Sequence, residues 1–145
     1  MGLDSTDCPI VKAKAKLKDT STDSDIRSAE RVLRLEADGL RALARALDDS
    51  FRRAIDVLAS VDGRVVVTGM GKSGHVARKI AATLSSVGTP ALYVHPGEAS
   101  HGDLGMITRS DALLALSSSG ETVELSNLLA YSRRFSIPLI GITSE

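Results

Sequence analysis

The sequence has few of the residues on which several classes of protein depend. It contains one cysteine, no tryptophan and only 3% aromatic residues. A single cysteine excludes an intramolecular disulfide and is typical of a reducing compartment. Nucleic-acid-binding surfaces use aromatic rings for stacking or an excess of basic charge, and this chain balances 18 basic residues against 18 acidic ones. We therefore expect no nucleic-acid partner.

Long apolar runs are also missing from the sequence. No run approaches the roughly 20 residues that a membrane-spanning helix requires. The N-terminus lacks the apolar segment of a secretory signal. We therefore expect a cytoplasmic protein with no membrane partner, and the length of 145 residues predicts a single hydrophobic core.

The first third of the chain changes character at residue 26. Residues 1–25 are rich in Ser, Thr, Asp and Lys without a helical period, which predicts a disordered tail. In residues 26–59 apolar side chains recur at alternating steps of four and three, as on an amphipathic helix. Asp48-Asp49-Ser50 suits a helix start, so this helical arm is either one long helix or two. Its long apolar stripe also suits pairing of subunits and predicts a homo-oligomer.

Residues 64–145 alternate short apolar runs with amphipathic helical segments. Three consecutive valines form the first run, which glycines end, and this pattern predicts a buried strand. The repeated alternation predicts an α/β fold with a doubly wound parallel sheet, covered by helices on both faces. The expected strands are residues 65–67, 91–94, 111–116 and 138–143.

Two turns of this predicted fold contain groups that suit an anion. Right-handed crossovers bring the carboxyl ends of parallel strands to one edge, so we expect both turns to border one cleft. Gly69-Met-Gly-Lys-Ser-Gly74 precedes a helix whose first N–H groups would point into the turn. The second turn adds the hydroxyl groups of Ser117, Ser118, Ser119 and Thr122. A serine-rich helix cap without a ligand is an equally good interpretation of the second turn.

The first turn also matches parts of two nucleotide-binding motifs. A dinucleotide fingerprint requires an acidic residue about 20 positions later, near which this chain has His95. A nucleoside-triphosphate loop requires a glycine at the position of Val66. Both nucleotide interpretations therefore fail on a named residue, and we expect no cofactor.

The loop that follows the second predicted strand contains several residues able to bind a metal. They are His95, Glu98, His101 and Asp103. Pro96 and the two glycines of this loop give no familiar ligand spacing. We expect no metal here, and a metal site is kept as the alternative.

Three ordered motifs carry a resemblance to a known family. They are Gly69-Met-Gly-Lys-Ser-Gly-His75, Val94-His-Pro-Gly-Glu-Ala-Ser-His-Gly-Asp-Leu-Gly-Met106 and Ser117-Ser-Ser-Gly-Glu-Thr-Val-Glu124. Together they resemble the sugar-isomerase (SIS) domain of the arabinose-5-phosphate isomerases, over roughly residues 26–145. The resemblance implies a flavodoxin-like sheet and a phosphorylated sugar as ligand. It also implies interconversion of D-ribulose 5-phosphate and D-arabinose 5-phosphate, which feeds 3-deoxy-D-manno-octulosonate and lipopolysaccharide synthesis in Gram-negative bacteria.

The resemblance further implies roles for individual residues. Lys72, His101 and Glu124 would be catalytic, because aldose-ketose exchange needs a base and a cation or donor near the developing oxyanion. The alternatives are that Lys72 only neutralises phosphate, that Glu124 stabilises a helix dipole and that His101 is a hydrogen-bonding loop residue. The implied substrate-binding residues are Gly71, Ser73, Ser117, Ser118, Ser119 and Thr122.

The sequence departs from the family after Glu145. Family members continue with another strand and helix, which supply a further carboxylate and a catalytic histidine, and usually with a pair of CBS modules. The resemblance thus implies a SIS domain that is incomplete at its C-terminal end. Because each missing acid-base group typically costs about 10² to 10⁴ in rate, a catalytically inactive phosphosugar-binding or regulatory module is the alternative to an isomerase.

Overall fold

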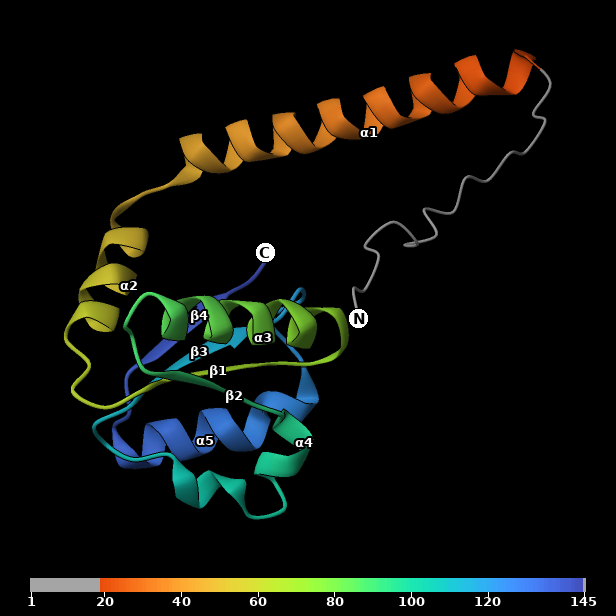
Figure 1. Cartoon of the computed structure of the whole chain (residues 1–145). Coiled ribbons are helices and arrows are strands. Elements are labelled where there is room, and N and C mark those ends of the chain that lie inside the picture. Colours follow the sequence, from red (N-terminus) through yellow and green to blue (C-terminus); the bar gives the residue numbers. More distant parts are fainter. Residues whose placement is uncertain (1–18, 145) are drawn as a thin grey trace, which may run out of the picture. The chain divides into compact units, whose positions relative to one another are not determined.

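The computed structural model describes residues 19–144, with side chains from residue 23 onward (Figure 1). Residues 1–18, which make up most of the predicted tail, lie outside the described part. The chain divides into two compact units, one ending at Leu47 and the other beginning at Asp48. No helix of residues 19–144 has both the length and the hydropathy needed to cross a membrane.

The described part of the first unit contains one long helix, α1 (Asp19–Ala46). It begins at Asp19, so residues 19–25, which the sequence placed in the tail, are helical. Near this end, Asp23 and Arg27 lie one turn apart and form an exposed ion pair. Such pairs stabilise a helix by a few tenths of a kcal/mol each. The apolar stripe of α1 is exposed, with Leu40 69% accessible.

The helical arm of the sequence is two helices. The second, α2 (Asp49–Ala59), has Asp48 as its N-cap. The Asp48 carboxylate accepts a 2.8 Å hydrogen bond from the backbone N–H of Ser50. Hydrogen bonds from the Ser50 hydroxyl and N–H lower the pKa of Asp48. The cap at Asp48 explains why a new helix begins at Asp49. The apolar pattern continues through residue 58 although the chain forms two helices.

The second unit is built on a four-stranded sheet in which every pairing is parallel. The strand order, β2-β1-β3-β4, is that of the first four strands of a flavodoxin-like sheet. This order confirms the predicted doubly wound parallel fold. The strands are β1 (Val65–Gly69), β2 (Ala91–Val94), β3 (Ala112–Leu116) and β4 (Leu139–Ile142).

Helices cover both faces of the sheet (Figure 1). On one face, Val65 and Val67 pack with Ala77 and Ala81 of α3 (Gly71–Ser86). On the other, Val66 packs with Ala99 of α4 (Pro96–Ala99) and with residues of α5 (Ser126–Phe135). Successive strand residues point to opposite faces, so the three valines contribute to both cores. The short helices η1 (Asp103–Met106) and η2 (Val123–Leu125) complete the unit.

A buried carboxylate holds the amino-terminal ends of β1 and β3. Asp111, 2% exposed, accepts 2.8 Å hydrogen bonds from the backbone N–H groups of Arg64 and Thr108. Burial raises the pKa of Asp111, but the hydrogen bonds from Thr108 and Arg64 outweigh it, so the pKa lies below its ordinary value. A Cβ at Gly63 would lie 2.5 Å from Oδ1 of Asp111, which explains why glycine is needed beside this carboxylate.

Candidate functional site

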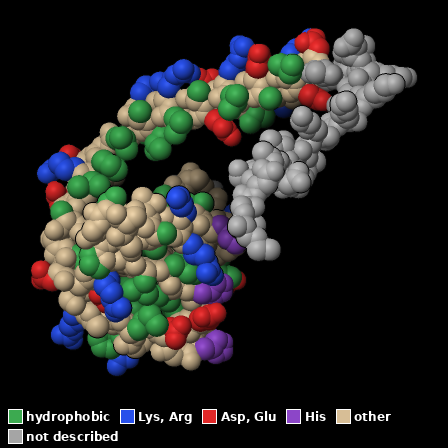
Figure 2. All heavy atoms as spheres, viewed as in Figure 1, with side chains coloured by type: hydrophobic (Ala, Val, Ile, Leu, Met, Phe, Trp, Pro, Cys, Tyr) green, Lys and Arg blue, Asp and Glu red, His purple; other side chains and the backbone are tan. Residues whose placement is uncertain are grey.

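The register of the sheet brings the two predicted anion-binding turns to the same edge. Gly69 at the end of β1 pairs with Leu116 at the end of β3. Because the strands are parallel and adjacent, residues 70–74 and 117–122 leave the sheet side by side at its carboxyl edge. Figure 2 shows the histidine side chains gathered on the side where α3 begins and α4 lies in Figure 1.

Glycines allow the first turn to pass very close to the sheet. A Cβ at Gly69 would lie 3.0 Å from the carbonyl oxygen of Leu116, and a Cβ at Gly74 would lie 2.7 Å from the carbonyl oxygen of Gly69. Gly71 has a φ of +52°, which favours glycine. The Tyr93 hydroxyl of β2 donates a 2.9 Å hydrogen bond to the Gly69 carbonyl. These contacts fix the path of the chain from β1 into α3.

The start of α3 leaves backbone donors free. Its N-cap, Met70, makes no side-chain capping bond. Among the described residues, the N–H groups of Gly71, Lys72 and Ser73 donate no hydrogen bond. The Lys72 side chain is exposed, and that of Ser73 is half-buried. Unpaired donors and the positive end of the helix dipole together favour an anion at this position.

The serine turn carries paired hydroxyl groups next to free N–H groups. The hydroxyl oxygens of Ser117 and Thr122 lie 2.7 Å apart. The Ser119 hydroxyl accepts a 3.3 Å hydrogen bond from the N–H of Glu121, which leaves its own proton available. Within residues 19–144, the N–H groups of Ser118, Ser119 and Gly120 donate no hydrogen bond.

The sequence predicted that an α-helix begins at the serine turn, and this prediction is wrong, because a short 3-10 helix comes first. The N–H of Leu125 donates to the carbonyl of Thr122 at 3.1 Å, which closes the tighter turn of η2 (Val123–Leu125) before α5 begins at Ser126. Glu124 lies in η2 and is exposed. The donor array of this turn is therefore made by the turn itself, with little help from the dipole of α5.

The residues after β4 also contribute to the serine turn, and the sequence did not predict this contribution. The N–H of Ser144 donates a 3.3 Å hydrogen bond to the carbonyl of Ser118, and its hydroxyl donates to the same oxygen. The two serine hydroxyl oxygens lie 3.3 Å apart. Ser144 thus holds Ser118 in place. Its position directly after a parallel strand is the signal that could have identified it.

The loop after β2 contains one residue with a clear local role. Nδ1 of His95 accepts a 3.2 Å hydrogen bond from the N–H of Gly97, which caps α4. The side chains of Glu98 and His101 are exposed. In residues 19–144 no group of three His, Cys, Asp or Glu residues could hold a metal ion.

The structure places the three predicted catalytic side chains on different elements. Lys72 lies at the start of α3, Glu124 in η2 and His101 between α4 and η1. All three are exposed, and none of their side chains makes a hydrogen bond or ion pair with another described residue. The three side chains are therefore free to contact a ligand, but they do not hold one another in position.

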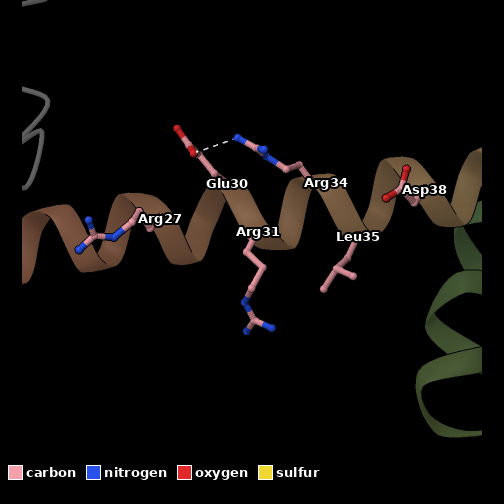
Figure 3. Close-up of a pocket in the computed structure, with 6 residues that line it drawn as sticks. All are labelled: Arg27, Glu30, Arg31, Arg34, Leu35 and Asp38. Atoms are coloured by element: carbon pink, nitrogen blue, oxygen red, sulfur yellow. Dashed lines mark hydrogen bonds and ion pairs between the residues drawn. The ribbon is translucent and has the colours of Figure 1, made fainter.

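A hollow lies along α1. Figure 3 shows Arg31 and Leu35 pointing to one side of the helix, while Glu30 and Arg34, joined at 3.3 Å, point to the other. Each lining residue belongs to one exposed helix, so the hollow is a gap between its side chains. The lining residues are Arg27, Glu30, Arg31, Arg34, Leu35 and Asp38.

Comparison with known proteins supports the assignment of these elements. Residues 58–145 match the model of the SIS domain. The chain belongs to the SIS domain family. This match includes α3, the serine turn and all four strands of the sheet, and thus the whole edge described above.

Several relatives of this SIS domain have names that state an activity. The chain is 54% identical over 120 residues to the arabinose 5-phosphate isomerase KdsD of Pseudomonas aeruginosa, covering 83% of this chain and 37% of the relative. It is 46% identical over 128 residues to KdsD of Francisella tularensis, covering 86% of this chain and 39% of the relative. The SIS domain chain thus spans less than two-fifths of these relatives.

A solved structure shares both fold and sequence with this SIS domain. It is a protein of Escherichia coli CFT073 in complex with arabinose 5-phosphate. The TM-score is 0.79 and the sequence identity 36%, with 89% of this chain and 67% of the other covered. The overlap includes most of the described fold.

Proposed function

We propose that the chain binds a phosphorylated sugar at the carboxyl edge of its sheet, as the SIS domain of an isomerase that interconverts D-ribulose 5-phosphate and D-arabinose 5-phosphate. The observation that carries the proposal is the pairing of Gly69 with Leu116, because it sets two donor-rich turns beside each other. The names of the KdsD relatives and the arabinose 5-phosphate complex of the E. coli protein support the choice of sugar phosphate.

The phosphate is proposed to lie between the two turns. The hydroxyl groups of Ser73 and Ser119, and one of the two hydroxyls of the hydrogen-bonded pair Ser117 and Thr122, would donate to its oxygens. Gly71 and Ser118 would contribute backbone N–H groups, since the Ser118 side chain is turned toward Ser144. The mixture of hydroxyl and N–H donors matters, because a helix terminus alone contributes only about 0.3 to 2 kcal/mol per charge.

The reaction is proposed to pass through an enediol. A base removes the proton from C2 of the aldose while the carbonyl oxygen on C1 gains a proton, which gives the enediol. The enediol is then protonated at C1 while the hydroxyl on C2 loses its proton, which gives the ketose. Glu124 and His101 are proposed to carry these protons, and Lys72 to stabilise the developing oxyanion. The proposal needs no metal or cofactor.

The wider setting is proposed from the same resemblance. The reaction would take place in the cytoplasm and supply lipopolysaccharide synthesis. A homo-oligomer is proposed because the apolar stripe of α1 is exposed, with Leu33 64% and Leu40 69% accessible. Measurement of the solution mass tests this point, and a monodisperse monomer at micromolar concentration contradicts it.

Calorimetric titration tests the binding site. We expect D-arabinose 5-phosphate to bind, and Ser119→Ala to weaken this binding by about tenfold or more, as expected for a hydrogen bond to a charged group. Ser86→Ala is the matched control, because it removes an exposed hydroxyl at the opposite end of α3. Unchanged affinity in Ser119→Ala would exclude the serine turn from the site.

Turnover of D-ribulose 5-phosphate tests the chemistry. We expect Lys72→Ala to lower kcat by about 10² or more and to change KM little, because an oxyanion donor acts in the transition state. Lys79→Ala, which alters another exposed lysine of α3, is the control. Tight binding of the sugar phosphate without turnover supports the alternative of a phosphosugar-binding module, and absence of both binding and turnover contradicts both functions.

A further inference from the structure

The segment that carries His101 is tied to α5 at two points. The side-chain amide of Asn127 donates a 2.9 Å hydrogen bond to the hydroxyl of Ser100, the residue before His101. The Tyr131 hydroxyl donates a 3.2 Å hydrogen bond to the carbonyl of Ile107. Asn127 and Tyr131 are four residues apart and therefore lie on the same face of α5. His101 lies between the two attached positions.

The first of these ties is the one nearest to the proposed chemistry. Ser100 is the C-cap of α4, and α4 packs against both η2 and α5. Asn127 follows Glu124 by three residues. The hydrogen bond between Asn127 and Ser100 thus connects the segment of one proposed proton carrier, His101, to the helical segment that contains the other.

Within the described part of the chain, the backbone just beyond Ser100 is otherwise held by local hydrogen bonds alone. The N–H of His101 donates to the Glu98 carbonyl at 2.9 Å, and the N–H of Gly102 donates to Ala99 at a longer 3.3 Å. Gly102 has a φ of +135°, a conformation that glycine adopts readily and other residues rarely. The Ser100 hydroxyl also donates to the Pro96 carbonyl at 3.3 Å, so Asn127 acts on a serine that is already oriented.

We propose that Asn127 is a positioning residue for His101. It holds Ser100, and through Ser100 the backbone of His101, against the helix that follows the serine turn. The inference rests on the proposed function only in one respect, namely that His101 faces the sugar part of the ligand. The phosphate is bound by other residues, so loss of this tie changes recognition of the sugar and leaves recognition of phosphate intact.

Amide hydrogen exchange and titration on the same chain test the proposal. Loss of one net hydrogen bond in Asn127→Ala is expected to speed exchange at His101 and Gly102 by about two- to tenfold. The affinity for D-arabinose 5-phosphate is expected to fall by a similar factor, while that for inorganic phosphate is unchanged. Ser126→Ala is the control, because this exposed neighbour makes no side-chain hydrogen bond with the described residues.

The conservative variant separates positioning from general destabilisation. In Asn127→Asp the carboxylate can accept a hydrogen bond from the Ser100 hydroxyl when that hydroxyl turns its single proton away from the Pro96 carbonyl, to which it donates at a long 3.3 Å. Exchange at His101 and Gly102 is therefore expected to stay near that of the parent chain. Unchanged exchange in Asn127→Ala, or an equal loss of affinity for both ligands, overturns the proposal. If the parent chain does not bind D-arabinose 5-phosphate, the proposed function fails, and the exchange measurement alone still decides whether Asn127 orders the segment of His101.

Discussion

Replacement of Asp111 by alanine should destabilise the α/β unit. Because Asp111 lies at the amino-terminal ends of the strands, the change should leave the carboxyl edge of the sheet unaltered. The carboxylate is 2% exposed and accepts hydrogen bonds from the N–H groups of Arg64 and Thr108 at 2.8 Å. It also accepts one from the Thr108 hydroxyl at 3.0 Å. That hydroxyl has a second partner in Ser110, whereas the two N–H groups would lose their only acceptor.

The size of the effect follows from these two orphaned donors. Each buried donor left without a partner costs about 1 to 3 kcal/mol. Arg64 is half-buried and Thr108 is exposed, so water will reach part of the vacated space. We therefore expect the free energy of unfolding to fall by about 2 to 4 kcal/mol, with a decrease in Tm of about 10 °C or more. Asp111→Asn should lose less, because its amide oxygen can still accept one hydrogen bond.

The same carboxylate should contribute to the pH dependence of stability. Its folded-state pKa lies below the ordinary value, because hydrogen bonds from Thr108 and Arg64 outweigh the effect of burial. The unfolded state therefore binds the proton more tightly. The stabilisation is fully present above the unfolded pKa of about 4 and is lost as pH falls through the lower folded-state pKa. Asp111→Asn should remove this part of the acid-induced loss of stability.

Urea unfolding followed by far-ultraviolet circular dichroism measures the change, since the chain has no tryptophan. Asp62→Ala is the matched control, because Asp62 is an exposed carboxylate close to the same end of β1. An Asp111→Ala variant within about 0.5 kcal/mol of the parent chain, the range of an ordinary surface substitution, would refute the reasoning.

Three further changes test other parts of the structure. Gly74→Ala should destabilise the α/β unit by about 1 to 3 kcal/mol in thermal melts, because its Cβ would lie 2.7 Å from the Gly69 carbonyl oxygen. Gly39→Ala should stabilise α1 by up to about 1 kcal/mol and raise the helical signal in circular dichroism, since nothing lies within 4 Å of the new Cβ. Asp48→Ala should increase the rate of amide exchange in the first turn of α2, because the hydrogen bond from the Ser50 N–H is lost. Lowering the pH should have the same effect on the parent chain, because it protonates the Asp48 carboxylate.

The order of the elements in the α/β unit could be predicted from the sequence because local patterns determine it. The valines at 65–67 have high strand propensity, and glycines mark the turn that follows them. The strand β1 forms at this position. The predicted second strand, residues 91–94, is β2 (Ala91–Val94). Parallel pairing then places the turns after β1 and β3 at one edge, whatever the details of their side chains.

The start of α1 and the form of the serine turn could not be predicted in the same way. Ser, Thr and Asp before residue 26 are weak helix formers, yet acidic side chains near a helix start, including Asp23, favour the helix dipole. The η2 turn depends on one backbone hydrogen bond, from Leu125 to Thr122. A pattern of apolar positions does not distinguish that bond from the first bond of an α-helix.

The residues that support the site were invisible for a different reason. Ser144 contacts Ser118 across 26 positions, and Asn127 contacts Ser100 across 27. Each pair consists of ordinary polar residues with no motif of their own. Only the folded backbone brings each pair together. The position of Ser144 after a predicted strand is a signal for that residue alone, and a sequence without an alignment carries none for its pairing with Ser118 or for the pair of Asn127 and Ser100.

The uncapped start of α3 makes the composition of the buffer part of any measurement on this protein. Met70 supplies no side-chain partner for the first N–H groups of the helix, so solution anions compete for the same donors as a ligand. An anion that binds only the folded chain raises apparent stability in proportion to the logarithm of its concentration once it exceeds Kd. With phosphate bound as proposed, melting curves recorded in phosphate and in chloride would describe two differently occupied molecules, and ligand affinities measured in phosphate would be weakened by this competition.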